Sequence, residues 1–323
     1  MREDVFSALH ENGDYIRGIV TIPESNGLMN HGVIILGAGV NPRQSWHRLS
    51  VKIARLLSNA GFYALRIDPR GVGDSDGEIE NIDPQQLEGF HDKVQTGLFT
   101  YDCQLALTKF KKDFNLNSLF IIGLCGGALT GLYLTEIIRE IRGLIYIAGP
   151  VTLTTLDVSL PVHPAYARNM FYSYLKKVLN PVAWLRFLSG KSEYKTIFFL
   201  VRHKIYQFLG REKTILDRYA QRDSKNINEN GDRTNHLNPM IPKAFLNYMD
   251  QCGDILFINA EIDQASWGFN NLFAPMYLTP GKPYKGRYNI EMVKKSNHTF
   301  SSIEAQKELL SLILNWMEKF NKK

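Results

Sequence analysis

A cysteine between glycines, in the run Gly123-Leu124-Cys125-Gly126-Gly127, joins an apolar stretch to a segment of helical period in this 323-residue chain. In a nucleophile elbow the reactive residue occupies a tight strand-to-helix turn, and the neighbouring glycines avoid collisions with adjacent backbone. A thiol at the start of a helix also feels the helix dipole, which favours the thiolate. The pattern predicts that Cys125 is a nucleophile, with the Gly126 N–H facing the developing oxyanion. The alternatives are a small buried cysteine and a serine enzyme that has lost its activity.

Two later side chains, Asp263 and His298, follow apolar runs in the order nucleophile, acid, histidine that such a site requires. The carboxyl ends of parallel strands meet at one edge of a sheet, so both side chains can reach the cysteine. His298 would take the thiol proton or pair with the thiolate, and then protonate the leaving group. Asp263 would fix the tautomer of the imidazole. Glu261 is the nearest alternative acid, and a solvated loop histidine is the alternative interpretation of His298.

Two blocks of alternating strands and helices position these residues. The first block contains predicted strands at 32–37, 62–68, 119–124 and 144–149 and predicted helices at 48–59, 93–112 and 128–140. The second block contains predicted strands at 254–260 and 288–293 and a helix from about 303 to 320. Short β-branched runs separated by helices are typical of buried parallel strands with crossover connections.

The blocks correspond to a core that spans residues 1–150 and 250–323, and residues 151–249 form a predicted helical cap between its two parts. Between His163 and Arg218 this middle region has 11 lysines and arginines against three acidic residues. Its large apolar side chains could line a pocket for an acyl group or a ring: Phe171, Trp184, Phe187, Phe198 and Phe199. The basic charge would suit a coenzyme A or carrier-protein substrate, or an anionic membrane surface, and the alternative is a solvated lid.

Several motifs in the core resemble a known group. They are Gly37 with Gly39, Arg43 with His47 and Arg48, the run from Asp68 to Ser75, the cysteine elbow, and the SNHTFSS segment at 296–302. In these the chain resembles the serine aminopeptidase-like families of α/β hydrolases, and particularly the exosortase-system-associated hydrolases. The resemblance covers the core and not the cap. It implies an α/β-hydrolase fold, with a mostly parallel sheet, helices on both faces and a helical cap.

The same resemblance implies that the turn after the first parallel strand supplies a second oxyanion N–H, from Ala38 or Gly39. It does not extend to aminopeptidase activity, because the elbow carries a cysteine. Arg43, His47 and Arg48 are candidates for contact with a substrate anion; the alternative is a helix start with basic residues near a turn. We predict no cofactor and no metal site, because the run from Asp74 has too few oxygen ligands for a calcium loop.

The composition indicates the compartment and the kinds of partner that we expect for the protein. The N-terminus carries charges throughout, and no segment approaches the roughly 18 apolar residues of a membrane span. Three scattered cysteines predict neither a disulfide framework nor a metal pair, so we expect a reducing compartment, most simply the cytoplasm. A formal net charge of +6 does not by itself favour nucleic acid as a partner.

These patterns predict a cysteine-dependent hydrolase that acts on an ester or thioester through a covalent acyl-enzyme. An alternative is an acyltransferase or condensing enzyme with the same Cys-His-Asp triad, acting on a carrier-protein or coenzyme A thioester. Another is a non-catalytic binding protein on the same fold.

Overall fold

The computed structural model describes residues 1–24, 30–79, 87–153 and 237–321. Contacts between Cα atoms divide the chain into two compact units, one formed by Met1–Val158 with His236–Lys323 and the other by Ser159–Asn235. The second unit lies outside the described residues. So do most of the predicted cap, its basic stretch and the aromatic side chains named above.

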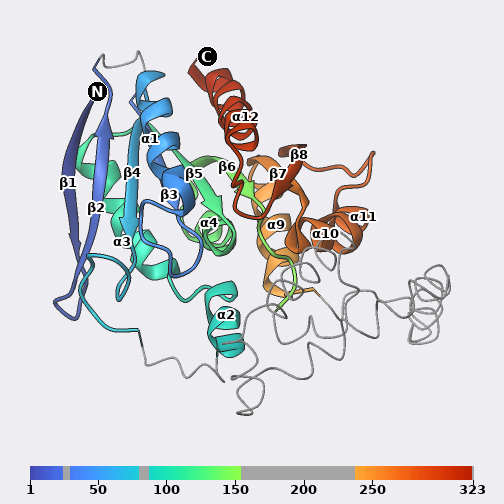
Figure 1. Ribbon diagram of the computed structural model, residues 1–323, viewed down its shortest axis with the longest axis horizontal. Helices are drawn as coiled ribbons and strands as arrows, with labels where there is room; N and C mark the ends of the chain where they lie inside the picture. Colours follow the sequence, from blue (N-terminus) through green and yellow to red (C-terminus); the bar gives the residue numbers. More distant parts are fainter. Residues whose placement is uncertain (25–29, 80–86, 154–236, 322–323) are drawn as a thin grey trace, which may run out of the picture. The chain divides into compact units, whose positions relative to one another are not determined.

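One eight-stranded sheet organises the described unit, with the strand order β1-β2-β4-β3-β5-β6-β7-β8 (Figure 1). Its strands are β1 (Arg2–Leu9), β2 (Tyr15–Ile22), β3 (His31–Leu36), β4 (Tyr63–Asp68), β5 (Ser118–Leu124), β6 (Ile141–Ile147), β7 (Asp254–Ile262) and β8 (Arg287–Asn297). Strands β3 to β8 are parallel to one another. All six predicted strands are present, and the mostly parallel sheet is confirmed.

The antiparallel part of the sheet was not predicted. Strands β1 and β2 form an antiparallel pair, and β2 is also antiparallel to β4. Because β1 lies at the edge, only two of its eight side chains are buried. Its sequence, REDVFSAL, therefore lacks the continuous apolar run by which the central strands were identified.

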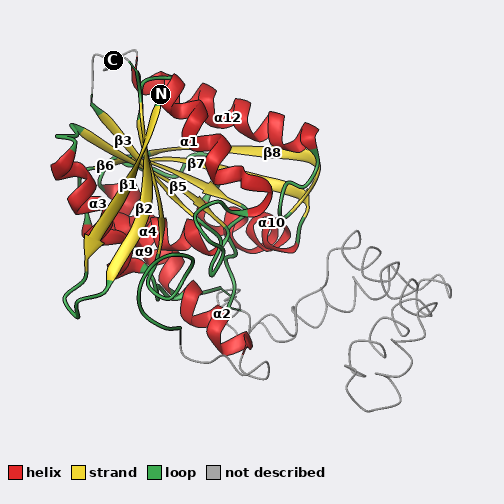
Figure 2. Cartoon of the chain, turned by 60° about the vertical axis from the view of Figure 1, so that its left-hand side comes forward, coloured by secondary structure: helices red, strands yellow, loops and turns green. Residues whose placement is uncertain are grey.

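Helices cover both faces of the sheet (Figure 2). They are α1 (Leu49–Asn59), α2 (Leu87–Gln95), α3 (Thr100–Asp113), α4 (Gly126–Ile137), α9 (Met240–Asp250), α10 (Gln264–Gly268), α11 (Ala274–Tyr277) and α12 (Ile303–Asn321), with single turns at η1 (Trp46–Arg48) and η5 (Phe269–Phe273). The helix predicted over 93–112 is two helices, because the chain turns between α2 and α3, where Gly97 has a φ of +104°. None of the helices in the described ranges combines the length and apolar character needed to cross a bilayer.

Helix α9 lies within the range expected for the cap, yet it packs against the core. It contacts α4, and its buried side chains include Phe245, Tyr248 and Met249. The hydroxyl of Tyr248 donates a hydrogen bond to the carbonyl of Ile141, at the start of β6. Residues 240–250 thus belong with the sheet in this structure.

Two hydrophobic cores lie on opposite faces of the sheet. Side chains of β3 alternate between them, so that Ile34 and Leu36 face one core and Val33 and Ile35 face the other. The first core includes residues of α3, α4 and α9, and the second includes residues of α1 and α12. Since both faces are covered, the central strands are apolar throughout. Strands β5, β7 and β8 end at one edge of the sheet, where the predicted site residues follow them.

Candidate active site

Cys125 follows β5 directly and immediately precedes α4. Its φ of 52° and ψ of −119° form a conformation that residues with a side chain rarely adopt. Backbone hydrogen bonds fix it: the Cys125 N–H donates to the carbonyl of Ile147 at 2.9 Å, and the Ala128 N–H donates to the carbonyl of Cys125 at 2.9 Å. The side chain is half-buried and forms no disulfide. Such strain, held by its surroundings, is typical of functional sites.

The glycines on either side of Cys125 are required by close backbone contacts. A Cβ atom on Gly123 would lie 2.3 Å from the carbonyl oxygen of Gly127. A Cβ atom on Gly127 would lie 2.4 Å from the carbonyl oxygen of Gly37, at the end of β3. No side chain fits at these separations. The glycines therefore let α4 start directly against the ends of two strands, which gives the elbow its tight turn.

His298 and Asp263 come from the ends of β8 and β7 and form a chain of contacts with Cys125. The Nδ1 atom of His298 lies 2.9 Å from Oδ1 of Asp263. Cys125 lies close enough to His298 that its sulfur contributes to raising the pKa of the imidazole. Because Nδ1 is directed at the carboxylate, the second ring nitrogen, Nε2, is the one left to exchange a proton with the sulfur. The His298 side chain is 30% exposed, so the site opens toward solvent.

Asp263 is held from several sides. It is 4% exposed and caps α10, accepting hydrogen bonds from the backbone N–H groups of Ala265 and Ser266. The hydroxyl of Ser266 also donates to Asp263 Oδ2 at 2.8 Å. The rival acid, Glu261, is exposed and accepts a hydrogen bond from the backbone N–H of Lys295 instead. Asp263, and not Glu261, is therefore the carboxylate hydrogen-bonded to His298.

Charges at the site favour an ion pair between the acid and the base. Burial alone would lower the pKa of His298, but hydrogen bonds with Asp263 and Cys125 and the negative charges of both groups raise this pKa from 6.5 to about 10. Burial would likewise raise the pKa of Asp263, but hydrogen bonds from His298 and Ser266 and the charge of His298 hold that pKa below its usual value. A protonated imidazole beside an ionised Asp263 is the arrangement that this electrostatic balance favours.

The backbone of two residues, Gly126 and Gly39, lies close together beside the elbow. Gly126 is the first residue of α4, and a Cβ atom on it would lie 3.4 Å from the backbone nitrogen of Gly39. Within the described part of the chain, neither the Gly126 N–H nor the Gly39 N–H has a hydrogen-bond acceptor. The Ala38 N–H likewise has no acceptor among the described residues, while the Ala38 carbonyl accepts two hydrogen bonds from Asn41. Of the two residues predicted for the second amide, Gly39 is the one beside Gly126.

The three basic residues predicted near the substrate differ in their surroundings. Arg43 forms ion pairs with Asp68 and Asp74. His47 and Arg48 are not buried, and both have positive φ values, 52° and 57°. The structure thus brings the Arg43 guanidinium against carboxylates and leaves the other two side chains at the surface.

Two residues at the site were not identified from the sequence. Ser266 lies three positions after Asp263, a spacing typical of a helix cap, which is the signal that could have identified it. Trp46 packs its ring edge-on against His298, with ring centroids 5.5 Å apart. No local signal marks this tryptophan, because its contact is made across the fold.

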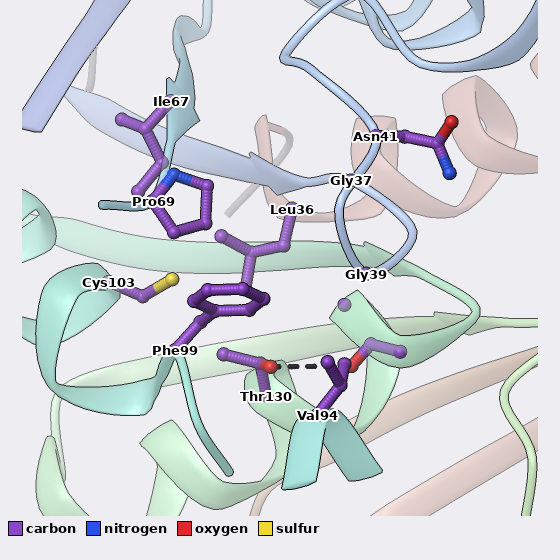
Figure 3. Close-up of a pocket in the computed structure, with 12 residues that line it drawn as sticks. Leu36, Gly37, Gly39, Asn41, Ile67, Pro69, Val94, Phe99, Cys103 and Thr130 are labelled. Carbon is purple, nitrogen blue, oxygen red and sulfur yellow. Dashed lines mark hydrogen bonds between the residues drawn. The ribbon is translucent and has the colours of Figure 1, made fainter. Parts of the chain in front are cut away.

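A pocket opens next to the two amides, on the side of α4 that faces α2 and α3 (Figure 3). Its wall contains the amide-bearing residues Gly39 and Gly126 together with apolar side chains such as Val94 and Phe99. The hydroxyl of Thr130, also in this wall, donates to the carbonyl of Gly126 at 3.3 Å. Among the described residues, no group of three or more His, Cys, Asp or Glu side chains could hold a metal ion.

Comparison with solved structures identifies the fold. Est1E from Butyrivibrio proteoclasticus, in a structure with ferulic acid bound, is 14% identical, with a TM-score of 0.55 over 98% of this chain and 99% of that one. An esterase from Pyrococcus furiosus is 14% identical, with a TM-score of 0.55 over 98% and 90%. A protein of unknown function from Agrobacterium tumefaciens, described as a putative α/β hydrolase, is 15% identical, with a TM-score of 0.52 over 100% and 98%.

The chain has the α/β-hydrolase fold, as predicted. No protein-family model and no curated protein sequence matches it. The resemblance to serine aminopeptidase-like and exosortase-system-associated hydrolases therefore stays a prediction.

Proposed function

We propose that this protein is a cysteine-dependent hydrolase that cleaves an ester or thioester through an acyl-enzyme on Cys125. The observation that carries the proposal is the line of contacts from Cys125 through His298 to the buried Asp263. Two amides without a described acceptor, at Gly126 and Gly39, lie beside the same sulfur-bearing turn. That an esterase shares the fold is in keeping with this assignment.

The residues account for each proton and bond of the reaction. The Cys125 sulfur attacks the carbonyl carbon while its proton resides on His298, and the carbonyl oxygen takes negative charge opposite the Gly126 and Gly39 amides. The bond to the leaving alkoxide or thiolate then breaks, and His298 supplies the proton that the leaving group needs. Water attacks the resulting thioester, gives a proton to His298, and the bond between sulfur and acyl carbon breaks. The acid is released and the thiol is restored.

An ester or thioester is favoured over a peptide by leaving-group chemistry. In the tetrahedral intermediate the Cys125 thiolate competes with the substrate's own leaving group for expulsion, and the thiolate of a thioester or the oxyanion of an activated ester competes far better than an unprotonated amine. Activated acyl groups therefore proceed to the acyl-enzyme. Linkage of the substrate to coenzyme A or a carrier protein, and a cytoplasmic location, stay predictions, since the basic stretch that suggested such substrates lies outside the described residues.

Turnover of a small activated ester, p-nitrophenyl acetate, tests the proposal. Cys125→Ala should lower the hydrolysis rate by at least about 10³-fold, because the nucleophile is lost. Cys252→Ala, at an exposed cysteine away from the triad, is the matched control and should keep the wild-type rate. Wild-type turnover by the Cys125→Ala variant would refute the proposal. Added amine and alcohol acceptors should leave free acid as the product, and acyl transfer to them at the expense of the acid would identify a transferase instead.

A further inference from the structure

The loop from Gly37 to Arg48, called here the oxyanion loop, reaches the candidate site at two points. Near its start, the backbone nitrogen of Gly39 lies beside Gly126. Near its end, the ring of Trp46 contacts the ring of His298 at an interplanar angle of 65°. A single loop between β3 and α1 thus supplies the second amide and also borders the general base.

The backbone of this loop is strained. Ser45, His47 and Arg48 all have φ between +52° and +58°, in a region that residues with a side chain rarely occupy. Three such residues within four positions persist only where other contacts hold them. Inside the loop, the backbone N–H of Ser45 donates to Pro42, and that of Arg48 donates to Ser45. These local bonds shape the turn but do not attach it to the sheet.

Arg43 provides the attachment. Its backbone N–H donates to Asp68, and its guanidinium binds both Asp68 and the more exposed Asp74. The side chain of Asp68 is fully buried at the end of β4, a central strand, and it also accepts a hydrogen bond from the Asp74 N–H at 3.1 Å. The Arg43 side chain is only 14% exposed. A buried carboxylate is costly without its partner, so this ion pair resists separation.

We propose that the Arg43–Asp68 ion pair is a positioning pair, which holds the oxyanion loop so that the Gly39 N–H faces the reacting carbonyl and Trp46 stays against His298. The part of this proposal that concerns the reacting carbonyl rests on the proposed function. In this proposal Arg43 positions the loop and does not contact a substrate anion, because two carboxylates already bind its guanidinium.

The kinetic consequence follows from where charge develops. An oxyanion amide interacts more strongly with the transition state than with the neutral ester. Loosening the loop should therefore lower kcat and leave KM nearly unchanged. Loss of a substrate contact by Arg43 would instead raise KM.

Substitutions in the full-length protein test the pair. Arg43→Gln alone leaves Asp68 buried without a countercharge and can impair folding, so the double variant Arg43→Gln/Asp68→Asn removes both charges together. Arg43→Lys keeps the charge but loses the planar fork. Arg55→Gln is the matched control, because Arg55 forms its ion pair with Glu3, away from the oxyanion loop. We expect kcat for p-nitrophenyl acetate to fall about 10- to 100-fold in the double variant, less in Arg43→Lys, and not in the control.

A second readout is independent of catalysis. The ring current of Trp46 should change the NMR chemical shifts of the His298 ring protons. The size of this change is measured as the difference between the wild type and Trp46→Leu. In the double variant these signals should move toward their Trp46→Leu positions, whereas Arg55→Gln should retain the wild-type signals.

Wild-type kcat with wild-type His298 signals in the folded double variant would overturn the positioning role, as would a rise in KM at unchanged kcat. Failure of the proposed function is recognised separately, by wild-type turnover in Cys125→Ala, while the NMR comparison still tests the loop.

Discussion

Replacing Asp263 by asparagine perturbs the base without changing the size of the side chain. Raising the pKa of His298 from 6.5 to about 10 corresponds to about 5 kcal/mol in favour of the imidazolium. Asp263 and Cys125 each contribute a hydrogen bond and a charge to that preference, so roughly half of it, about 2–3 kcal/mol, should be lost with the carboxylate. This loss alone corresponds to about 30- to 160-fold in rate.

The asparagine amide can also donate to Nδ1 and so impose the wrong tautomer, which in a comparable triad lowers kcat by about 10⁴-fold. We therefore expect kcat/KM of Asp263→Asn to fall by between about 10²- and 10⁴-fold. Hydrolysis of p-nitrophenyl acetate as a function of pH measures it, and the alkaline limb of the profile should move to lower pH, because the pKa of His298 falls when the carboxylate is removed.

Asp254→Asn is the matched control, since Asp254 begins the same strand, β7, and binds Arg287 at the opposite end. It should keep wild-type kinetics. A folded Asp263→Asn variant with kcat/KM within about threefold of wild type would refute the role given to Asp263.

Three further predictions concern the elbow, the acid and the core. Gly123→Ala should lower the free energy of unfolding, measured by urea titration, by about 1–3 kcal/mol, because the new Cβ would meet backbone at 2.3 Å. Gly268→Ala, whose Cβ would have its nearest contact at 3.6 Å, should not lower it. Equal stability of the two variants would contradict the steric argument. Ser266→Ala removes the hydroxyl that donates to Asp263 and accepts from the Ala260 N–H. The free energy of unfolding, measured by thermal unfolding, should therefore fall by about 1–3 kcal/mol. An unchanged stability would show that these two hydrogen bonds do not stabilise the fold. Burial lowers the pKa of His31 below 6.5, so the unfolded chain takes up a proton before the folded protein does as the pH falls through 6.5. The wild type should therefore lose stability, relative to His31→Phe, as the pH falls from above 6.5 to below it. Parallel curves of stability against pH for the two proteins would exclude this linkage.

The central strands were predictable because they are buried on both faces. GVIILG and LFIIGL, for example, are continuous apolar runs that end at turn residues. The elbow was predictable for a related reason, since the contact that requires Gly123 arises within the strand-to-helix turn itself; Gly127 is required by the end of β3. The positions of Asp263 and His298 followed from the rule that parallel strands end at one edge.

Other features depend on contacts between segments that are distant in the sequence. The ion pair of Arg43 is one example, because Asp68 lies 25 residues away and becomes its partner only when β4 pairs beside β3. Trp46 likewise meets His298 only in the folded protein. The edge strand β1 was missed because an edge position buries few side chains and leaves little periodic signal.

The position of the acyl group during turnover shows most directly whether Cys125 is the nucleophile. The wild-type protein, mixed with p-nitrophenyl acetate and quenched in acid within milliseconds to seconds, should carry one acetyl group as a thioester, released by neutral hydroxylamine and mapped by peptide mass spectrometry to the peptide that contains Cys125. Turnover of the ester with no acetyl group on Cys125, or with the group on another residue, would show that Cys125 is not the nucleophile.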